Sequence, residues 1–293
     1  MATQALHVVA QSATTMTPPA AAAKTVHVAK LIDISSCIGC KACQVACMEW
    51  NETRPVVGDT DGTYNNPLEL GANAWTVMKF NEVENAQGGI DWLIRKDGCM
   101  HCEDPGCLKA CPSPGAIVKL DNGIVDFNSD KCIGCGYCVA GCPFDVPKIS
   151  QTTNKATKCT LCSDRVSVGQ EPACVKACPT QALTFGPKDD RIKYANERIK
   201  DLNGRGYDKA SLYNPQGVGG THVMYVLPHG DKPTAYNGLP ADPKISSTVG
   251  LWKGIMKPIA LLTMAATVFA GVIHYAIKGP DTVDEDHDDS KKS

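Results

Sequence analysis

The sequence of 293 residues is poor in aromatic side chains, which make up 6% of it, and it has no excess of charge of either sign, since the formal net charge is −2. A chain that binds nucleic acid through its surface charge carries a clear basic excess, so we expect no nucleic-acid partner. A phosphate-binding loop, a dinucleotide-binding fingerprint and a nucleophile elbow are also missing. No group of residues resembles a substrate site, and we therefore expect a chain that is not itself an enzyme.

The first 30 residues lack the features of an export signal. They contain no basic segment followed by a long apolar run, and no pair of adjacent arginines. Proteins built on disulfides are usually secreted, so a disulfide scaffold is disfavoured. Residues 1–30 are rich in Ala, Thr and Pro, and we expect an extended arm that docks on a partner, with a disordered tail as the alternative.

Cysteine is what the sequence has in excess. All 16 cysteines fall into four groups of four with none left over, and three groups end in Cys-Pro. The groups are Cys37, Cys40, Cys43 and Cys47; Cys99, Cys102, Cys107 and Cys111; Cys132, Cys135, Cys138 and Cys142; and Cys159, Cys162, Cys174 and Cys178. The first and third groups have the spacing C-x2-C-x2-C-x3-C, which is typical of ferredoxins with [4Fe–4S] clusters.

Spacing decides between iron–sulfur clusters and zinc. A tight loop with a cysteine at every third residue can place three thiolates on one cubane, while the fourth cysteine points to another cluster. Gly39, Gly134 and Gly136 permit the close backbone approach that cluster sulfurs need. Zinc prefers two C-x2-C pairs that are separated by a longer gap, and only the fourth group fits that pattern. We predict four [4Fe–4S] clusters; a zinc-stabilised, membrane-anchored interaction protein is the alternative.

The crossed ligation of two-cluster ferredoxins predicts the fold. Groups two and three, adjacent in sequence, form one ferredoxin-like unit, and groups one and four close around them as a second unit. The predicted class is α+β, a nested double ferredoxin-like domain over residues 31–185 with a peripheral insert at 48–98. Residues 186–247 are predicted to be a peripheral linker that packs on partner subunits, with a helix near 190–202 and a strand near 221–227.

A membrane anchor is predicted at residues 248–278. Its centre, Pro258 to Ile277, has 20 consecutive residues without a formal charge, enough to cross about 30 Å of hydrocarbon as a helix. A buried core helix is the alternative. His274 lies inside the span, either as a contact to haem or quinone in a neighbouring subunit or as an interfacial side chain. An acidic, polar tail follows at 279–293, and the flanking lysines do not decide the orientation.

Several polar side chains lie within or beside the cysteine groups. His101 is expected to be a surface residue or to lie just outside the ligands, since four cysteines already serve its group. Cationic side chains near a cluster raise its reduction potential. The candidates are Lys41, Lys109, Lys131, Lys158 and Lys176, and the sequence does not rank them.

Four stretches carry a family resemblance. They are SCIGCKACQVACMEWN from Ser36, WLIRKDGCMHCEDPGCLKACP from Trp92, CIGCGYCVAGCPFDVP from Cys132 and KCTLCSDRVSVGQEPACVKACPT from Lys158. With these and the C-terminal anchor, the sequence resembles the iron–sulfur (beta) subunits of membrane-bound respiratory formate dehydrogenases, within the four-cluster subunits of molybdopterin oxidoreductases. The resemblance implies four ligand sets: set A, Cys37, Cys40, Cys43 and Cys178; set B, Cys159, Cys162, Cys174 and Cys47; set C, Cys99, Cys102, Cys107 and Cys142; and set D, Cys132, Cys135, Cys138 and Cys111.

The resemblance also implies partners and a location. A molybdopterin alpha subunit with molybdenum or tungsten would oxidise formate, this protein would relay electrons, and a cytochrome b gamma subunit would reduce quinone. We expect a single-pass protein of the bacterial inner membrane whose cluster domain faces the periplasm, exported with the catalytic subunit, with a cytoplasmic-facing domain as the alternative. The same relay role in a hydrogenase or another molybdoenzyme complex is the alternative function.

Overall fold

The computed structural model describes residues 6–13, 25–55, 57–59, 62–85 and 88–279. It divides into two units, Met1–Val249 and Gly250–Ser293. Much of the arm predicted at 1–30 and nearly all of the tail predicted at 279–293 lie outside the described residues.

Short elements dominate the first unit. The strands are β1 Val8–Gln11, β2 Val28–Asp33, β3 Val77–Glu84, β4 Ile90–Asp97, β5 Ile117–Leu120, β6 Val125–Phe127, β7 Lys148–Ile149, β8 Ala156–Thr157, β9 Leu183–Pro187, β10 Ser211–Tyr213 and β11 Val223–Leu227. The helices are α1 Ala42–Trp50, α2 Gly106–Ala110, α3 Tyr137–Ala140, α4 Ser163–Ser167, α5 Ala173–Lys176, α6 Lys188–Gly204, α7 Ser247–Leu251 and α8 Lys257–Lys278. This mixture of helix and sheet confirms the predicted α+β class.

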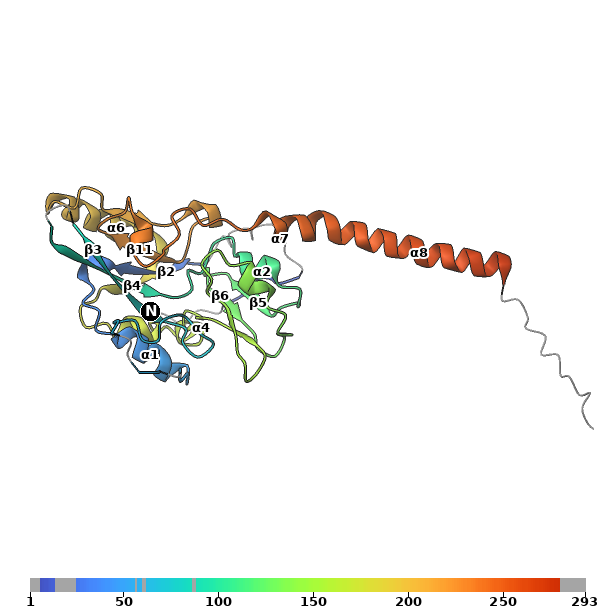
Figure 1. Cartoon of the computed structure of the whole chain (residues 1–293), viewed down its shortest axis with the longest axis horizontal. Helices are drawn as coiled ribbons and strands as arrows, with labels where there is room; N and C mark the ends of the chain where they lie inside the picture. The colour runs from blue at the N-terminus through green and yellow to red at the C-terminus, as the bar shows by residue number, and fades with distance from the viewer. Residues whose placement is uncertain (1–5, 14–24, 56, 60–61, 86–87, 280–293) are drawn as a thin grey trace, which may run out of the picture. The chain divides into compact units, whose positions relative to one another are not determined.

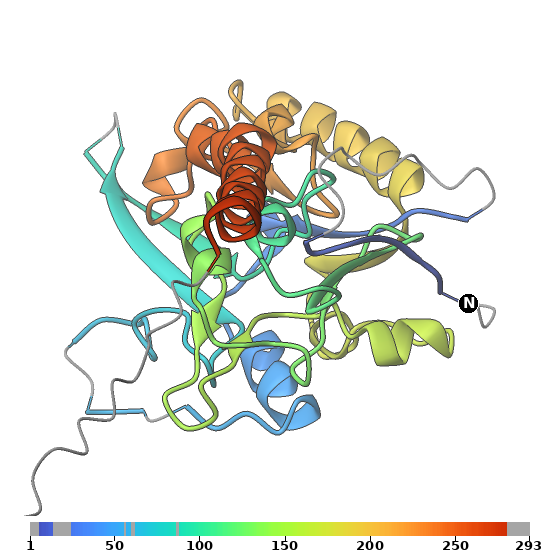
Figure 2. The same cartoon turned by 90° about the vertical axis from the view of Figure 1, so that its right-hand side faces the viewer.

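One four-stranded sheet, in the order β10-β11-β2-β9, organises one half of the first unit. Strand β2 runs parallel to β11 and antiparallel to β9. Successive side chains of a strand point to opposite faces, and Ala29 and Leu31 of β2 pack against Ala195 and Leu202 of α6. Figures 1 and 2 show α6 on one side of this sheet and α1 on the other.

The second face of the sheet points toward the cysteines. Val28 and Ile32 of β2 lie in a core cluster with Cys43 of α1 and Cys174 of α5. Helices α1 and α5, from the first and fourth cysteine groups, pack against each other. The sheet therefore supports the half of the domain in which the two ends of the cysteine region meet.

A three-stranded sheet, in the order β1-β5-β6, organises the other half. Its Ala10, Ile117 and Val125 form a core with Leu108 of α2 and Cys138 of α3. The helices α2 and α3, from groups two and three, pack against each other. Strand β1 comes from the predicted arm and pairs with β5, so this part of the arm is an edge strand of the domain.

The insert at 48–98 contains the hairpin of β3 and β4, in continuous register from Val77 opposite Asp97 to Glu84 opposite Ile90. Its outer part is exposed, as Trp92 shows at 52%. Its inner part enters the core through Met78 and Leu93. The insert thus has a peripheral tip and a buried base.

The segment 186–247 differs from the peripheral linker that the sequence suggested. The expected helix is α6 and the expected strand is β11, but all five residues of β11 are buried between β10 and β2. Tyr225 of β11 donates a hydrogen bond to the carbonyl of Lys96, at 2.7 Å. Because β11 pairs in parallel with a strand far earlier in the sequence, its burial depends on a contact that no local pattern reveals.

The second unit is helical. A helix long and apolar enough to cross a membrane extends over Ser247–Lys278, with a π-helical turn at Trp252–Met256. None of its residues is buried, which disfavours a buried core helix. Helix α8 covers the predicted span.

A largely buried ion pair joins α6 to the end of β2. The Arg198 guanidinium lies 2.8 Å from the Asp33 carboxylate and also donates to Ser35, at 2.9 Å. We expect Arg198→Met to destabilise the protein by about 2 kcal/mol, because the Asp33 carboxylate loses its cationic partner. Circular dichroism should show the temperature of half-unfolding lowered by roughly 4–8 °C.

The matched control is Arg205→Met. Its partner Asp201 is also on α6, but the Arg205 side chain is 61% exposed. Exposed pairs contribute about 0–1 kcal/mol, so we expect almost no change. Equal effects of the two substitutions would contradict the assigned role of Arg198.

Candidate iron–sulfur cluster sites

The first cysteine of each group begins the same local turn. The residue two positions later has a positive φ in all four groups: 67° at Gly39, 47° at His101, 73° at Gly134 and 54° at Leu161. The last three donate their backbone N–H to the Sγ of the first cysteine, at 3.5, 3.4 and 3.4 Å. Such a turn aims N–H groups at sulfur, as anionic sulfur requires.

Burial distinguishes the cysteines from one another. Eleven are buried, and only Cys40 and Cys135 are exposed. Burial raises the pKa of Cys43 and of Cys138 to about 12. These thiols are therefore protonated at neutral pH, and iron would have to displace their protons, since metal ligands bind as thiolates.

Two cavities are each lined by four cysteines from two groups. The first is lined by Cys99, Cys102 and Cys107 of group two together with Cys142 of group three. The second is lined by Cys159, Cys162 and Cys174 of group four together with Cys47 of group one. The members of these cavities are those of the predicted sets C and B.

The other cysteines have electrostatic neighbours from two groups as well. Burial raises the pKa of Cys37, and the Cys178 and Cys40 thiolates raise it further. Burial also raises the pKa of Cys138, and the next largest contributions, from Cys111, Cys132 and Cys135, raise it further. Thus Cys37 of the first group has a neighbour in the fourth group, Cys178, which is the fourth member of set A. Cys138 of the third group has a neighbour in the second group, Cys111, which is the fourth member of set D.

His101 is fully buried and lines the same cavity as Cys99. Its Nδ1 accepts a hydrogen bond from the backbone N–H of Val125, at 3.1 Å, so the neutral ring carries its proton on Nε2. Burial and nearby lysines hold the pKa of His101 well below its ordinary value, which keeps the ring neutral. Among the described residues Nε2 has no hydrogen-bond partner. A buried N–H donor in a cavity of thiols fits a site for a cluster, whose sulfurs accept hydrogen bonds.

The structure ranks the lysines that the sequence left unranked. Lys158 is buried, Lys41 and Lys109 are half-buried, and Lys131 and Lys176 are exposed. Two further buried lysines, Lys30 and Lys96, lie near cysteines but outside the cysteine groups. Neither lysine was predicted from the sequence. The only local indication is strand alternation: Ala29 and Leu31 point to one face of β2, so Lys30 shares the opposite face with Val28.

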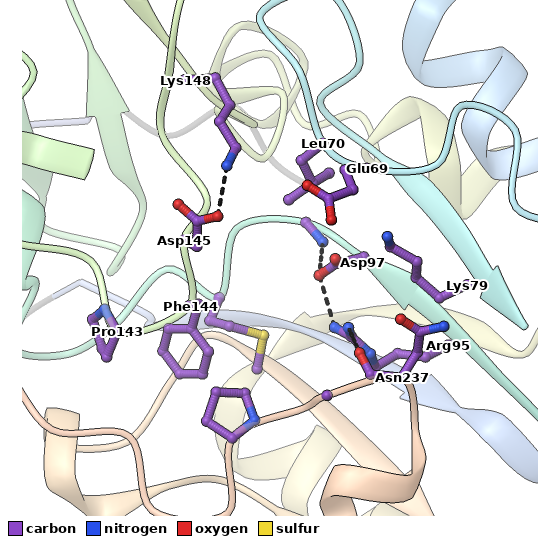
Figure 3. A pocket seen from close by; sticks show the side chains of 14 residues that line it. Glu69, Leu70, Lys79, Arg95, Asp97, Pro143, Phe144, Asp145, Lys148 and Asn237 are labelled. Atoms are coloured by element: carbon purple, nitrogen blue, oxygen red, sulfur yellow. Dashed lines mark hydrogen bonds and ion pairs between the residues drawn. The ribbon is translucent and has the colours of Figure 1, made fainter. Parts of the chain in front are cut away.

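A separate surface pocket contains no cysteine in its lining (Figure 3). Arg95 pairs with Asp97 and Lys148 pairs with Asp145, both at 2.7 Å. Phe144, two residues after Cys142, contributes an apolar side chain to the lining. These internal ion pairs account for four of its charged groups, and we assign the pocket no chemistry.

Family models match most of the sequence. Residues 36–116 and residues 90–188 each match a model described as "4Fe-4S dicluster domain". Residues 245–288 match one described as "Formate dehydrogenase N, transmembrane". These matches confirm the prediction of [4Fe–4S] clusters on ferredoxin-like units and of a C-terminal membrane anchor.

Similar proteins include three from Escherichia coli. The "Formate dehydrogenase-O iron-sulfur subunit" is 58% identical over 288 residues, which cover 98% of this chain and 96% of the relative. The "Formate dehydrogenase, nitrate-inducible, iron-sulfur subunit" is 58% identical over 293 residues, or 99% of each protein. A subunit of the anaerobic dimethyl sulfoxide reductase of the same organism is 40% identical over 162 residues, which cover 55% of this protein and 74% of the relative.

Two glycines allow α2 and α3 to approach closely. A Cβ on Gly106 would lie 2.2 Å from the carbonyl oxygen of Gly141, which is backbone and cannot move aside cheaply. We expect Gly106→Ala to displace Cys107 from Cys142 and to lower the iron content of the purified protein by about a quarter, one cluster in four.

The control for this substitution is Gly58→Ala, since a Cβ on Gly58 meets no atom within 4 Å. Its iron content, measured by atomic emission, should equal that of the unchanged protein. Full iron in the Gly106 variant would show that the contact between α2 and α3 does not hold a cluster site.

Proposed function

Since this protein belongs to the family of formate dehydrogenase iron–sulfur subunits, we propose that it relays electrons from a formate-oxidising molybdopterin subunit to a membrane cytochrome b that reduces quinone. Bound [4Fe–4S] clusters supply one-electron transfer. The protein's own residues supply the ligands, exclude water and position the sites. The observation that carries this proposal is the pair of buried cavities, each lined by four cysteines from two groups.

We propose that the sets A, B, C and D are the ligand sets of four clusters. The two cavities support sets B and C. The neighbours of Cys37 and Cys138 support sets A and D. In every set three cysteines come from one group and the fourth from another, as in two-cluster ferredoxins.

The proposed sets form a linear series. Cys138 of set D is an electrostatic neighbour of Cys107 of set C. Cys159 of set B is a neighbour of Cys99 of set C. Cys174 of set B is a neighbour of Cys43 of set A. These neighbours support the order A, B, C, D for the path of electrons through the domain.

Both ends of this series reach the surface. Set A contains the exposed Cys40, beside Ile38 at 64% exposure. Set D contains the exposed Cys135, beside Ile133 at 63%. An apolar side chain next to an exposed ligand suits a partner that must approach the site and keep water out. We propose that the two partners dock at these two ends.

The polypeptide leaves the first unit near α2. Ile245 is packed beside Gly106, where an added Cβ would lie 3.2 Å from its side chain. The connection to the anchor therefore starts beside the helix that carries Cys107 of set C. This supports a membrane partner, the cytochrome b, at the set D end and the molybdenum or tungsten subunit at the set A end. The cluster domain is proposed to face the periplasm, and His274 to lie at the cytochrome interface.

Purification of the complex tests the function directly. Beyond the iron of the partner subunits, including the cytochrome haem, we expect about 16 iron atoms per copy of this protein, together with a broad absorbance near 400 nm that dithionite bleaches. Formate and a quinone analogue should support turnover. Zinc in place of iron would overturn the cluster assignment, and electron uptake from hydrogen but not formate would overturn the choice of substrate.

Cysteine variants test the crossed ligation. In the proposed sets, Cys37→Ser and Cys178→Ser should alter the same electron paramagnetic resonance signal, because both remove a ligand of set A. Likewise Cys47→Ser and Cys159→Ser should share a second signal. If Cys178→Ser instead matches Cys159→Ser, each group serves its own cluster and the crossed sets are wrong.

A further inference from the structure

Three lysines are almost completely buried among the cysteines. Lys30, Lys96 and Lys158 are 1%, 3% and 3% exposed. No carboxylate among the described residues lies within 4.0 Å of any of their Nζ atoms. A buried ammonium without an anion is unfavourable, so these three charges need a partner of another kind.

Their hydrogen bonds go to neutral groups or to sulfur. Lys96 donates to the Thr76 hydroxyl at 3.0 Å. Lys158 donates to the carbonyl oxygens of Val125 and Cys159, the latter at 3.0 Å. The Nζ of Lys30 lies 4.0 Å from the Sγ of Cys174. Hydrogen bonds of this kind satisfy the N–H donors without balancing the charge.

Lys96 lies between set A and set B. It donates to Thr76, which lines the set B cavity, and it is paired across the β3–β4 hairpin with Met78, whose Sδ lies 3.4 Å from the Sγ of Cys43 in set A. Burial alone lowers its pKa, but Cys174, Cys43, Cys159 and Cys47 raise it above the ordinary value. Cys43 belongs to set A and the other three belong to set B. The side chain thus faces both sets at their junction.

Lys158 lies between set B and set C. It lines the set C cavity. Burial lowers its pKa, and the groups that raise it most strongly are Cys99 and Cys107 of set C. Its hydrogen bond to the carbonyl of Cys159 attaches it to set B as well.

Buried lysines that lie away from the cysteines have ordinary partners. Lys119 is 2% exposed and forms an ion pair with Glu103. Lys79, on β3 of the insert hairpin, is 7% exposed and donates to the carbonyl of Leu68, and Asp97 and Glu69 raise its pKa against the effect of burial. Among the described residues, the pattern of buried lysines near sulfur and without an ion pair is therefore specific to the cluster sites; at Lys158 the Asp126 carboxylate also raises the pKa, after Cys99 and Cys107.

We propose that Lys96 and Lys158 are fixed positive charges at the junctions between neighbouring clusters, where each stabilises the reduced form of both clusters beside it. The inference rests on the proposed function, because it requires anionic clusters at sets A, B and C. One cation that serves two adjacent sites raises both potentials together. The potentials along the series then stay close, so electrons meet no large step at a junction. Lys30 adds a third charge on the set B side.

The test is a redox titration of the purified complex followed by electron paramagnetic resonance. Lys96→Met removes the charge and keeps the length of the side chain, and Lys158→Met does the same at the other junction. We expect each to lower the potentials of two clusters, so that the ratio of reduced to oxidised cluster at a fixed potential falls about tenfold, or about 59 mV for one electron. One cluster, that of set B, should shift in both variants, and that of set D in neither.

Three controls separate charge from shape. Lys96→Arg retains the charge and should retain all four potentials within a small shift. Lys79→Met removes a buried charge from the same hairpin, where the charged neighbours of Lys79 are carboxylates and other cations rather than cysteines, and should leave every potential unchanged. Iron content is measured first for each variant.

The possible outcomes differ in what they imply. Unchanged potentials in Lys96→Met, or an equal shift of all four clusters, would overturn the inference. Loss of iron in Lys96→Met but not in Lys96→Arg would support the inference, because only the charge differs. Loss of iron in both variants would show that the lysine acts through packing, and it would overturn the inference. If the unchanged protein itself lacks four clusters, the proposed function fails instead.

Discussion

The proposed crossed ligation is the constraint on which this fold depends. Helices α2 to α5 have only four or five residues each, and helices of that length have little stability of their own. Four helices pack as pairs, α1 with α5 and α2 with α3, and each pair joins cysteine groups that a cluster is proposed to bridge. A metal cluster that binds cysteines from two segments closes a loop of polypeptide, so cluster binding and folding are coupled. The sheets β10-β11-β2-β9 and β1-β5-β6 then support one pair each.

The burial of three lysine ammonium groups is a second consequence of this arrangement. Moving an ammonium group from water into a protein interior costs several kcal/mol, and three such groups lie among the cysteines. The cost is tolerable only if anions occupy the same interior, and thiolates bound to iron provide them. The buried N–H of His101 has the same explanation, since among the described residues it has no acceptor. Cysteines, lysines and this histidine therefore form one electrostatic unit although they come from different elements.

The sequence was sufficient for the features that depend on local pattern. The cysteine spacing, the run of uncharged residues in α8, the periodicity of α6 and the alternation of β11 each lie within one segment. It was insufficient where two distant segments meet. The burial of β11 depends on its parallel pairing with β2, and the position of Lys96 depends on how the β3–β4 hairpin packs under Tyr225. Lys30 and Lys96 are outside every cysteine motif, so no spacing rule could have selected them.

The two ends of the cysteine series differ in their charged neighbours, and this difference bears on the direction of electron transfer. The four-stranded sheet and α6 support the half that contains sets A and B, and all three buried lysines have neighbours in those sets. In set D, by contrast, the main electrostatic neighbours of Cys138 within the described residues are cysteines and none of these lysines. Its cluster would consequently lack the stabilisation of the reduced form that these three lysines give the other clusters, although Lys155 donates to the carbonyl of Cys132 there. A cluster that holds its electron less tightly suits the proposed exit of electrons, at the end beside the connection to the membrane anchor.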